Sequence, residues 1–277
     1  MPDTTKKGFL GWWQNTPADS TGKTLFVAIT LCLFCSMIVA AAAVALRPVQ
    51  DANKLLDKRR NILQVAGLYE QGMDINAVFS STFEPKIVDL ATGEFVDRVE
   101  GGKDQVFTTA DYDDRAAVDD MNLSLPLDED PAGIGRKVKY AMVYLLKNDD
   151  GTLDKVILPI SGYGLWSTLY GFIALEEDAN TIFGLQFYEQ GETPGLGAEV
   201  DNPRWKALWH DKKLADDDGD LRITVAKGSP TGEAAQYHID ALAGATLTSR
   251  GVDNLVRFWM GEQGFEPFLG RIRNGDV

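Results

Sequence analysis

Cysteine and histidine are scarce in this sequence. Its 277 residues include two cysteines, Cys32 and Cys35, and two histidines, His210 and His238. Both cysteines fall inside an apolar run, where we interpret them as small apolar residues of a helix. If that helix crosses a membrane, the side of it that carries both cysteines could also contact a helix of another membrane subunit. Neither a disulfide framework nor a zinc site can be built from them. No Ser-His-Asp set or His-Glu-x-x-His arrangement is available either, which excludes the common hydrolytic sites.

Positive charge is outnumbered, with 27 lysine and arginine residues against 41 aspartate and glutamate, and a nicotinamide fingerprint is missing. No Gly-x-Gly-x-x-Gly opens a helix after an expected strand, so no nicotinamide site of that type is predicted. The net charge of the chain is −14. Residues 1–60 have a net charge of +4, so residues 61–277 have a net charge of −18. Because nucleic-acid phosphates require lysine and arginine, an acidic domain of this kind excludes nucleic-acid binding.

Long hydrophobic runs are limited to one. Residues 25–46 contain no charge and lie between Lys23 and Arg47. As a helix this run would reach about 33 Å, enough to cross a bilayer core of about 30 Å. A cleaved signal peptide is the alternative, because residues 40–45 are mostly alanine, but the apolar region of a signal peptide has only about 7–15 residues. We therefore expect a retained anchor at 25–46, an N-terminal segment at 1–24 and one domain at 47–277.

The middle of the chain has the pattern of paired strands. Residues 138–147 and 153–160 flank an Asp-Gly pair, which is a strong hairpin signal, and residues 171–175 and 182–189 flank a second turn. Residues 162–167, between the two pairs, contain too much glycine for an ordinary strand. This pattern predicts an antiparallel sheet with segregated helices, an α+β fold.

Helices and acidic loops complete the layout. One helix is expected at 54–68 and another at 202–214, the second capped by Asn202. The acidic stretches 111–130 and 216–220 match no calcium-binding loop, and we interpret both as solvated loops.

Residues 240–249 join an expected strand to the last expected helix. Apolar residues recur at helical spacing after this stretch, at Val252, Leu255, Val256, Trp259 and Met260. Thr248 or Ser249 is the expected N-cap, and Gly244 lets the backbone come close to a ligand. The helix N-terminus favours a phosphate. Taken alone, such a run of small residues is most simply a tight turn.

The same stretch resembles the attachment motif of the FMN-binding domain family, in which an acidic residue precedes a small-residue run that ends in Ala-Thr. Matched residue by residue, Asp240 takes the acidic position, Gly244 and Ala245 the small pair, and Thr246 the threonine that carries FMN through a phosphoester bond. The chain has Ala243 where the family has serine or threonine, which removes a hydroxyl contact but not the acceptor. The resemblance therefore implies FMN bound covalently to Thr246.

Two further stretches extend the resemblance over nearly the whole chain. Residues 162–167, Gly-Tyr-Gly-Leu-Trp-Ser, and residues 191–199, Gly-Glu-Thr-Pro-Gly-Leu-Gly-Ala-Glu, are similar to motifs of the NqrC family, which belongs to the sodium-translocating NADH:quinone reductase. The related flavin-bearing family of Rnf-type electron-transfer complexes shares the attachment motif, but the 162–167 block favours the former. The resemblance implies flavin contacts at Glu192, Thr193, Gly195, Leu196 and Gly197, and a second wall at Gly164, Leu165, Trp166 and Ser167. Alternatively, both stretches are tight connections and Trp166 is a core residue.

A covalent flavin without evident substrate chemistry indicates an electron relay. The resemblance implies that the donor and acceptor are redox groups in partner subunits, whose turnover passes electrons from NADH to quinone and drives sodium export. It also implies a separate flavin transferase that uses FAD and magnesium, with Asp240 as a recognition element. A noncovalent ligand-binding module and a structural component without cofactor are the alternatives from other classes.

Two arguments predict opposite orientations of the anchor in the membrane. Three lysines precede the apolar run and five basic residues follow it within residues 47–60, so the positive-inside rule favours a cytoplasmic domain. Long domains can be translocated despite such charges, and the resemblance implies the periplasmic face of the bacterial inner membrane. We follow the resemblance and expect a single-pass protein with its main domain in the periplasm.

Overall fold

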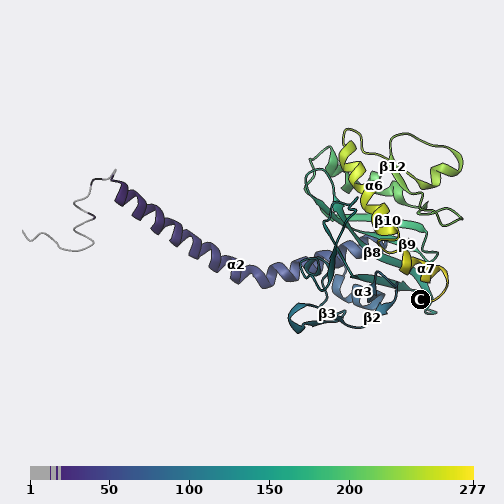
Figure 1. Ribbon diagram of the computed structural model, residues 1–277, viewed down its shortest axis with the longest axis horizontal. Coiled ribbons are helices and arrows are strands. Elements are labelled where there is room, and N and C mark those ends of the chain that lie inside the picture. Colours follow the sequence, from purple (N-terminus) through teal and green to yellow (C-terminus); the bar gives the residue numbers. More distant parts are fainter. Residues whose placement is uncertain (1–12, 14–16, 18–19) are drawn as a thin grey trace, which may run out of the picture. The chain divides into compact units, whose positions relative to one another are not determined.

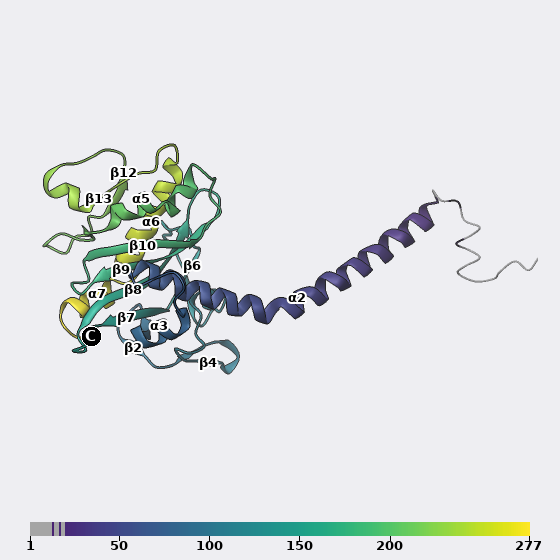
Figure 2. The ribbon, with the colours of Figure 1, turned by 180° about the vertical axis from the view of Figure 1, so that it is seen from behind.

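A computed structural model describes residues 13, 17 and 20–277 of the chain (Figures 1 and 2). The chain divides into two compact units, one ending at Leu55 and the other formed by Leu56–Val277. Helix α2 (Thr21–Val65) contains the apolar run and, among the described helices, is the one long and apolar enough to cross a membrane. Every side chain of residues 25–46 is exposed.

Helix α2 is continuous where the sequence predicts two separate helical segments. Pro48 lies inside it. A proline removes one backbone donor and kinks a helix, but it does not end one that good helix formers continue on both sides. The helix stops at Val65 because Gly67 takes a left-handed conformation, with φ of 74°. Its last turns bury Asn61, Ile62, Leu63 and Val65.

The described residues form a seven-stranded sheet in the order β11-β10-β9-β8-β7-β1-β2. All neighbouring strands in it run antiparallel, which confirms the α+β fold. The hairpins expected from the Asp-Gly pair and from the second turn are confirmed as β7–β8 and β9–β10. The strands are β1 (Phe83–Asp89), β2 (Phe95–Val96), β7 (Tyr140–Lys147), β8 (Leu153–Tyr163), β9 (Thr168–Glu176), β10 (Thr181–Glu189) and β11 (Lys212–Lys213).

Short elements flank the sheet at its two edges. In both views the β12–β13 pair lies beyond β10, and the β3–β4 hairpin lies at the β2 end (Figures 1 and 2). The remaining elements of the domain are α3 (Ile75–Thr82), β3 (Val99–Glu100), η1 (Gly102–Asp104), β4 (Val106–Phe107), α4 (Asp114–Ala117), β5 (Ser124–Pro126), β6 (Arg136–Val138), η2 (Gly197–Asp201), α5 (Pro203–Lys206), η3 (Ala207–Trp209), β12 (Thr224–Ala226), η4 (Gly232–Tyr237), β13 (His238–Asp240), α6 (Thr246–Met260) and α7 (Glu266–Arg273).

Helices cover both faces of the sheet within the Leu56–Val277 unit. On one face, Gln186 of β10 donates a hydrogen bond from Nε2 to Oδ1 of Asn61 in α2, at 3.1 Å. The register places Gln186 beside Phe172 and Phe172 beside Pro159. Gly162, three residues after Pro159, points to the other face, where a Cβ would stand 2.4 Å from Cβ of Leu255 in α6. Helix α6 therefore packs directly on β8, and the five apolar positions predicted for it are all buried.

Two expectations about local structure near the C-terminal half are wrong. The helix expected at 202–214 ends at Lys206, although Asn202 caps it as predicted by accepting a hydrogen bond from the Arg204 N–H at 2.9 Å. The chain turns at Asp211, with φ of 60°, and β11 then pairs with β10. Helix α7 follows α6, which the sequence pattern made the last helix. In both cases pairing or packing with distant segments overrides the local pattern.

Candidate functional site

The predicted attachment threonine lies where α6 begins. Strand β13 pairs in parallel with β12 and ends at Asp240, whose carbonyl accepts a hydrogen bond from Nε1 of Trp205 at 2.9 Å. Gly244 has φ of 75°, a left-handed conformation that glycine adopts without strain. The next turn presents Thr246 as the first residue of α6, with an exposed side chain whose hydroxyl has no partner among the described residues.

The first turn of α6 has no side-chain cap. The sequence predicts Thr248 or Ser249 at the N-cap, but Ala245 occupies that position. Ser249 instead accepts a hydrogen bond from the Leu242 N–H at 2.9 Å, and Thr248 donates its hydroxyl to Glu192. Because no side chain in the described part of the chain satisfies the leading N–H groups, the positive end of the helix is available to an anion beside Thr246.

Glu192 joins the two glycine-rich motifs to this helix. Its Oε1 accepts the N–H of Leu165 at 3.0 Å, that of Trp166 at 2.9 Å and, more weakly, that of Ser167 at 3.4 Å. Its Oε2 accepts the hydroxyl of Thr248 at 2.6 Å. Burial raises the pKa of Glu192, but these hydrogen bonds outweigh burial and hold the pKa below its usual value. We call this set of contacts the Glu192 bridge.

Glycines surround the bridge because no other residue fits. A Cβ at Gly164 would stand 2.6 Å from Oε1 of Glu192, and one at Gly197 would stand 2.5 Å from the Thr248 hydroxyl. At Gly251 in α6, a Cβ would meet the Tyr163 carbonyl oxygen at 2.4 Å. The three predicted motifs therefore come together in space, and their glycines are the points of closest approach.

Apolar side chains are exposed around the same three motifs. Trp166 is 66% exposed, Leu196 44% and Leu165 37%, and Leu247 follows the attachment threonine with 52% exposed. Exposure of Trp166 excludes the alternative that it is a core residue. Large apolar side chains left in water beside a polar acceptor are typical of a surface that a flat ligand or a partner covers.

The other residues predicted for the site shape the turns of the loops or are exposed at the surface. The Thr193 carbonyl accepts the N–H groups of Leu196 and Ala198, each at 3.1 Å, which shapes the turn. Gly195 has φ of 75° and open space around it. The Ser167 hydroxyl accepts the Gly191 N–H at 2.6 Å. The Asp240 carboxylate is exposed, with Nε2 of His238 3.3 Å away.

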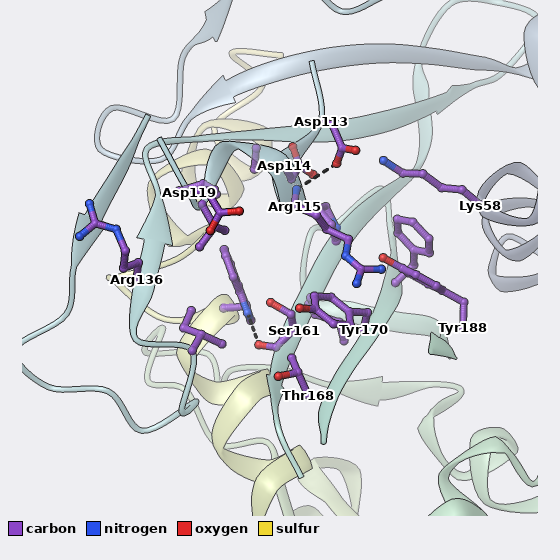
Figure 3. A pocket seen from close by; sticks show the side chains of 18 of the residues that line it. Lys58, Asp113, Asp114, Arg115, Asp119, Arg136, Ser161, Thr168, Tyr170 and Tyr188 are labelled. Atoms are coloured by element: carbon purple, nitrogen blue, oxygen red, sulfur yellow. Dashed lines mark hydrogen bonds between the residues drawn. The ribbon is translucent and has the colours of Figure 1, made fainter. Parts of the chain in front are cut away.

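A cavity of about 330 Å³, lined in part by Ser161 and Thr168 on either side of the 162–167 motif, was not predicted from the sequence (Figure 3). Its lining comes from helix ends and strands far apart in the chain, so no local motif marks it. The Arg115 guanidinium lies 3.8 Å from the Tyr170 ring centroid and pairs with Glu189. Asp114 lines the cavity too and accepts the Met142 N–H at 2.9 Å, so the expectation that residues 111–130 are a solvated loop is wrong there.

Asp114 and Lys58, which both line this cavity, have shifted pKa values. Burial raises the pKa of Asp114 to about 6, although the charge of Lys58 and the hydrogen bond from Met142 act in the opposite direction. Tyr144 and Asp114 in turn raise the pKa of Lys58 against its own burial. None of the residues predicted for the flavin site lines this cavity.

The fold and the site define the class of protein. The FMN-binding domain family matches residues 164–261, a segment that contains the 191–199 and 240–249 motifs whole and residues 164–167 of the first motif. The chain is 51% identical to NqrC of the Na(+)-translocating NADH-quinone reductase of Pseudomonas aeruginosa, over 94% of this chain and 98% of that one. It is 46% identical to the corresponding protein of Vibrio campbellii, over 94% and 98% of the two chains. This chain belongs to the NqrC family of the Na(+)-translocating NADH-quinone reductase.

The solved structures agree with this assignment. The crystal structure of NqrC from Shewanella oneidensis matches with a TM-score of 0.70 at 34% identity, over 80% of this chain and 99% of that chain. The resemblance to the NqrC family stated from the three motifs is thereby confirmed.

The residues present fit an FMN group. An exposed threonine hydroxyl stands at an uncapped helix N-terminus, which suits a phosphoester, and exposed leucine and tryptophan side chains flank it, which suits a flat aromatic ring.

Proposed function

We propose that this chain carries FMN in a phosphoester bond to Thr246 and relays electrons within a sodium-translocating NADH:quinone reductase. The observation that carries the proposal is the exposed hydroxyl of Thr246, which has no partner among the described residues and lies at the uncapped start of α6, the helix that the Glu192 bridge joins to the glycine-rich loops. The family to which the chain belongs supports this complex over the Rnf-type alternative. The other subunits of the complex are the proposed partners and hold the electron donor and acceptor.

The side chains of the site act by position and environment. FMN supplies the electron chemistry when bound. The first turn of α6 offers N–H groups and a positive dipole end to the phosphate. Leu165, Trp166 and Leu196 would offer apolar surface to the ring, and the backbone of Thr193, Gly195 and Gly197 would offer hydrogen-bonding groups to its polar edge. Gly244 and Ala245 leave room for the attached group.

The bond to Thr246 requires a second protein. A threonine hydroxyl is a poor nucleophile without a base beside it, and no side-chain base contacts Thr246 in the described part of the chain. We propose a flavin transferase that uses FAD and Mg²⁺, so that the Thr246 oxygen bonds to the phosphate next to the flavin and AMP leaves. Asp240 is the proposed recognition element, because its carboxylate is exposed at the entrance to the loop.

The anchor and its orientation are part of the proposal. Residues 25–46 of α2 cross the bacterial inner membrane, residues 1–24 stay in the cytoplasm and residues 47–277 form the periplasmic domain. The uncharged, exposed apolar run supports the crossing. Protease added to intact spheroplasts should degrade the domain, whereas a domain resistant until lysis would place it in the cytoplasm, as the positive-inside count suggests.

Flavin fluorescence of the denatured protein tests the attachment. The full chain, co-expressed with a flavin transferase, should give a fluorescent band in a denaturing gel, and Thr246→Ala should be dark. Thr231→Ala is the matched control, because Thr231 is also exposed but lies outside the three motifs. Asp240→Ala should reduce the fluorescence of the band.

Each other outcome contradicts part of the proposal. A dark parent band would favour a noncovalent binding module. A fluorescent Thr246→Ala band would move the attachment to another residue, and full incorporation in Asp240→Ala would remove its role in recognition.

A further inference from the structure

We propose that Glu192 is a positioning residue of the flavin site and does not itself contact the flavin. The Glu192 bridge holds the loop that carries Leu165 and Trp166 against the first turn of α6, two residues from Thr246. This inference rests on the proposed function, since it concerns how the chain prepares the attachment site.

The carboxylate is fully engaged by the protein. Two backbone N–H groups bond to Oε1 at 2.9 and 3.0 Å, and the Thr248 hydroxyl bonds to Oε2 at 2.6 Å. Glu192 is 5% exposed and Thr248 1% exposed. A carboxylate with both oxygens bonded in this way has little capacity left for a ligand, and turning it outward would leave three donors without an acceptor.

The space around the carboxylate is shaped for this role. Added Cβ atoms at Gly164 and Gly197 would each stand 2.6 Å from a Glu192 oxygen. The carboxylate therefore fills a slot between the two loops. A ligand contact would call for the opposite arrangement, with an oxygen facing open space.

The bridge connects the two halves of the proposed site. Leu165 and Trp166 offer their N–H groups inward to Glu192 and their side chains outward to solvent. Thr248 lies in the same helical turn as Thr246, so the bridge fixes the apolar wall relative to the attachment oxygen. Ser167 adds a second tie between the loops through its bond with the Gly191 N–H at 2.6 Å.

Amide hydrogen exchange and flavin incorporation together test the inference on the full chain. In Glu192→Ala, exchange at Leu165 and Trp166 should accelerate at least about tenfold, and flavin incorporation should fall by about as much, because two charge-assisted bonds are lost. Glu192→Gln should restore both to within about threefold of the parent, since its carbonyl still accepts the two N–H groups and its amide can donate to Thr248.

Glu199→Ala is the matched control. Glu199 lies in the same motif, within η2, but its carboxylate accepts a hydrogen bond from Asn202 at 2.6 Å, whereas the N–H groups of Leu165 and Trp166 bond to Glu192. This variant should leave exchange at those two amides unchanged. The inference is overturned if Glu192→Ala keeps parental exchange and incorporation, or if Glu192→Gln is as impaired as Glu192→Ala.

Failure of the proposed function would look different. The exchange measurement is repeated in the Thr246→Ala background, where attachment is abolished. If Glu192→Ala accelerates exchange in the Thr246→Ala background and the parent protein carries no flavin, the bridge is retained and the covalent flavin is rejected. If Glu192→Ala leaves exchange unchanged in that background and the parent protein carries flavin, the bridge is rejected and the covalent flavin is retained.

Discussion

Replacing Thr248 by valine isolates the hydroxyl that reaches Glu192. Valine has the same shape and the same branching at Cβ, so helix propensity and packing change little. The hydroxyl donates at 2.6 Å to a carboxylate oxygen, and both side chains are buried. A buried hydrogen bond to a charged group contributes about 1.5–3 kcal/mol, so we expect a loss of about 2 kcal/mol in the free energy of unfolding.

Urea denaturation followed by tryptophan fluorescence measures this loss, on the full chain in detergent. With a slope of about 2–3 kcal/mol/M for a domain of this size, the midpoint should fall by roughly 0.7–1 M urea. Thr181→Val is the matched control, because the Thr181 hydroxyl bonds to Asp178 at the same 2.6 Å but at an exposed position. Exposed bonds of this kind contribute at most about 1 kcal/mol.

The pH dependence gives a second check with a defined sign. The pKa of Glu192 lies below its usual 4.5 in the folded chain, so the stability from its charged form is present above about pH 4.5 and is lost as pH falls through the folded pKa. The difference between Thr248→Val and the parent should therefore shrink in that acidic range. An equal difference at pH 7 and in acid, or a midpoint within about 0.2 M of the parent at pH 7, would refute a charge-assisted bond.

Two further predictions concern backbone and charge. Gly244→Ala should destabilise the fold by about 1–2 kcal/mol and lower flavin incorporation, because φ of 75° strains an alanine and its Cβ would stand 3.2 Å from Leu196; urea midpoints and in-gel fluorescence check both. Asp114→Asn should remove a pH-dependent loss of stability. Burial raises the Asp114 pKa from 3.8 to about 6, so the folded state holds the proton more tightly and the parent loses stability relative to the variant as pH rises through this window. Midpoints at pH 4 and pH 6.5 that move in parallel for the two proteins would contradict this.

Local patterns were sufficient to predict the central strands and the attachment helix. The two stretches that flank the Asp-Gly turn identified β7 and β8, and helical spacing identified the buried face of α6. These signals depend on neighbours in sequence, which a single chain displays directly. The strand order, with β11 beside β10 and β1 beside β7, depends on pairing between distant segments and has no local signature.

The site was predicted only as three separate motifs. Their resemblance to a family pointed to Asp240, Thr246 and the glycine-rich loops, but nothing local shows that Glu192 is turned inward. The resemblance to the family placed Glu192 among the flavin contacts. Whether a carboxylate faces a ligand or its own backbone depends on the tertiary approach of residues 165, 166 and 248, which sequence spacing does not reveal.

The close packing at Gly164 and Gly197 limits how this site can diverge between relatives. Four positions in three separate segments, 164, 192, 197 and 248, share one small volume, so a substitution at one changes what the others tolerate. A descendant that exchanged the carboxylate for a smaller group could accept larger residues at 164 and 197, and would no longer need a hydroxyl at 248. These positions should therefore be inherited as a set, and mixed combinations should be rare even where the rest of the domain has changed freely.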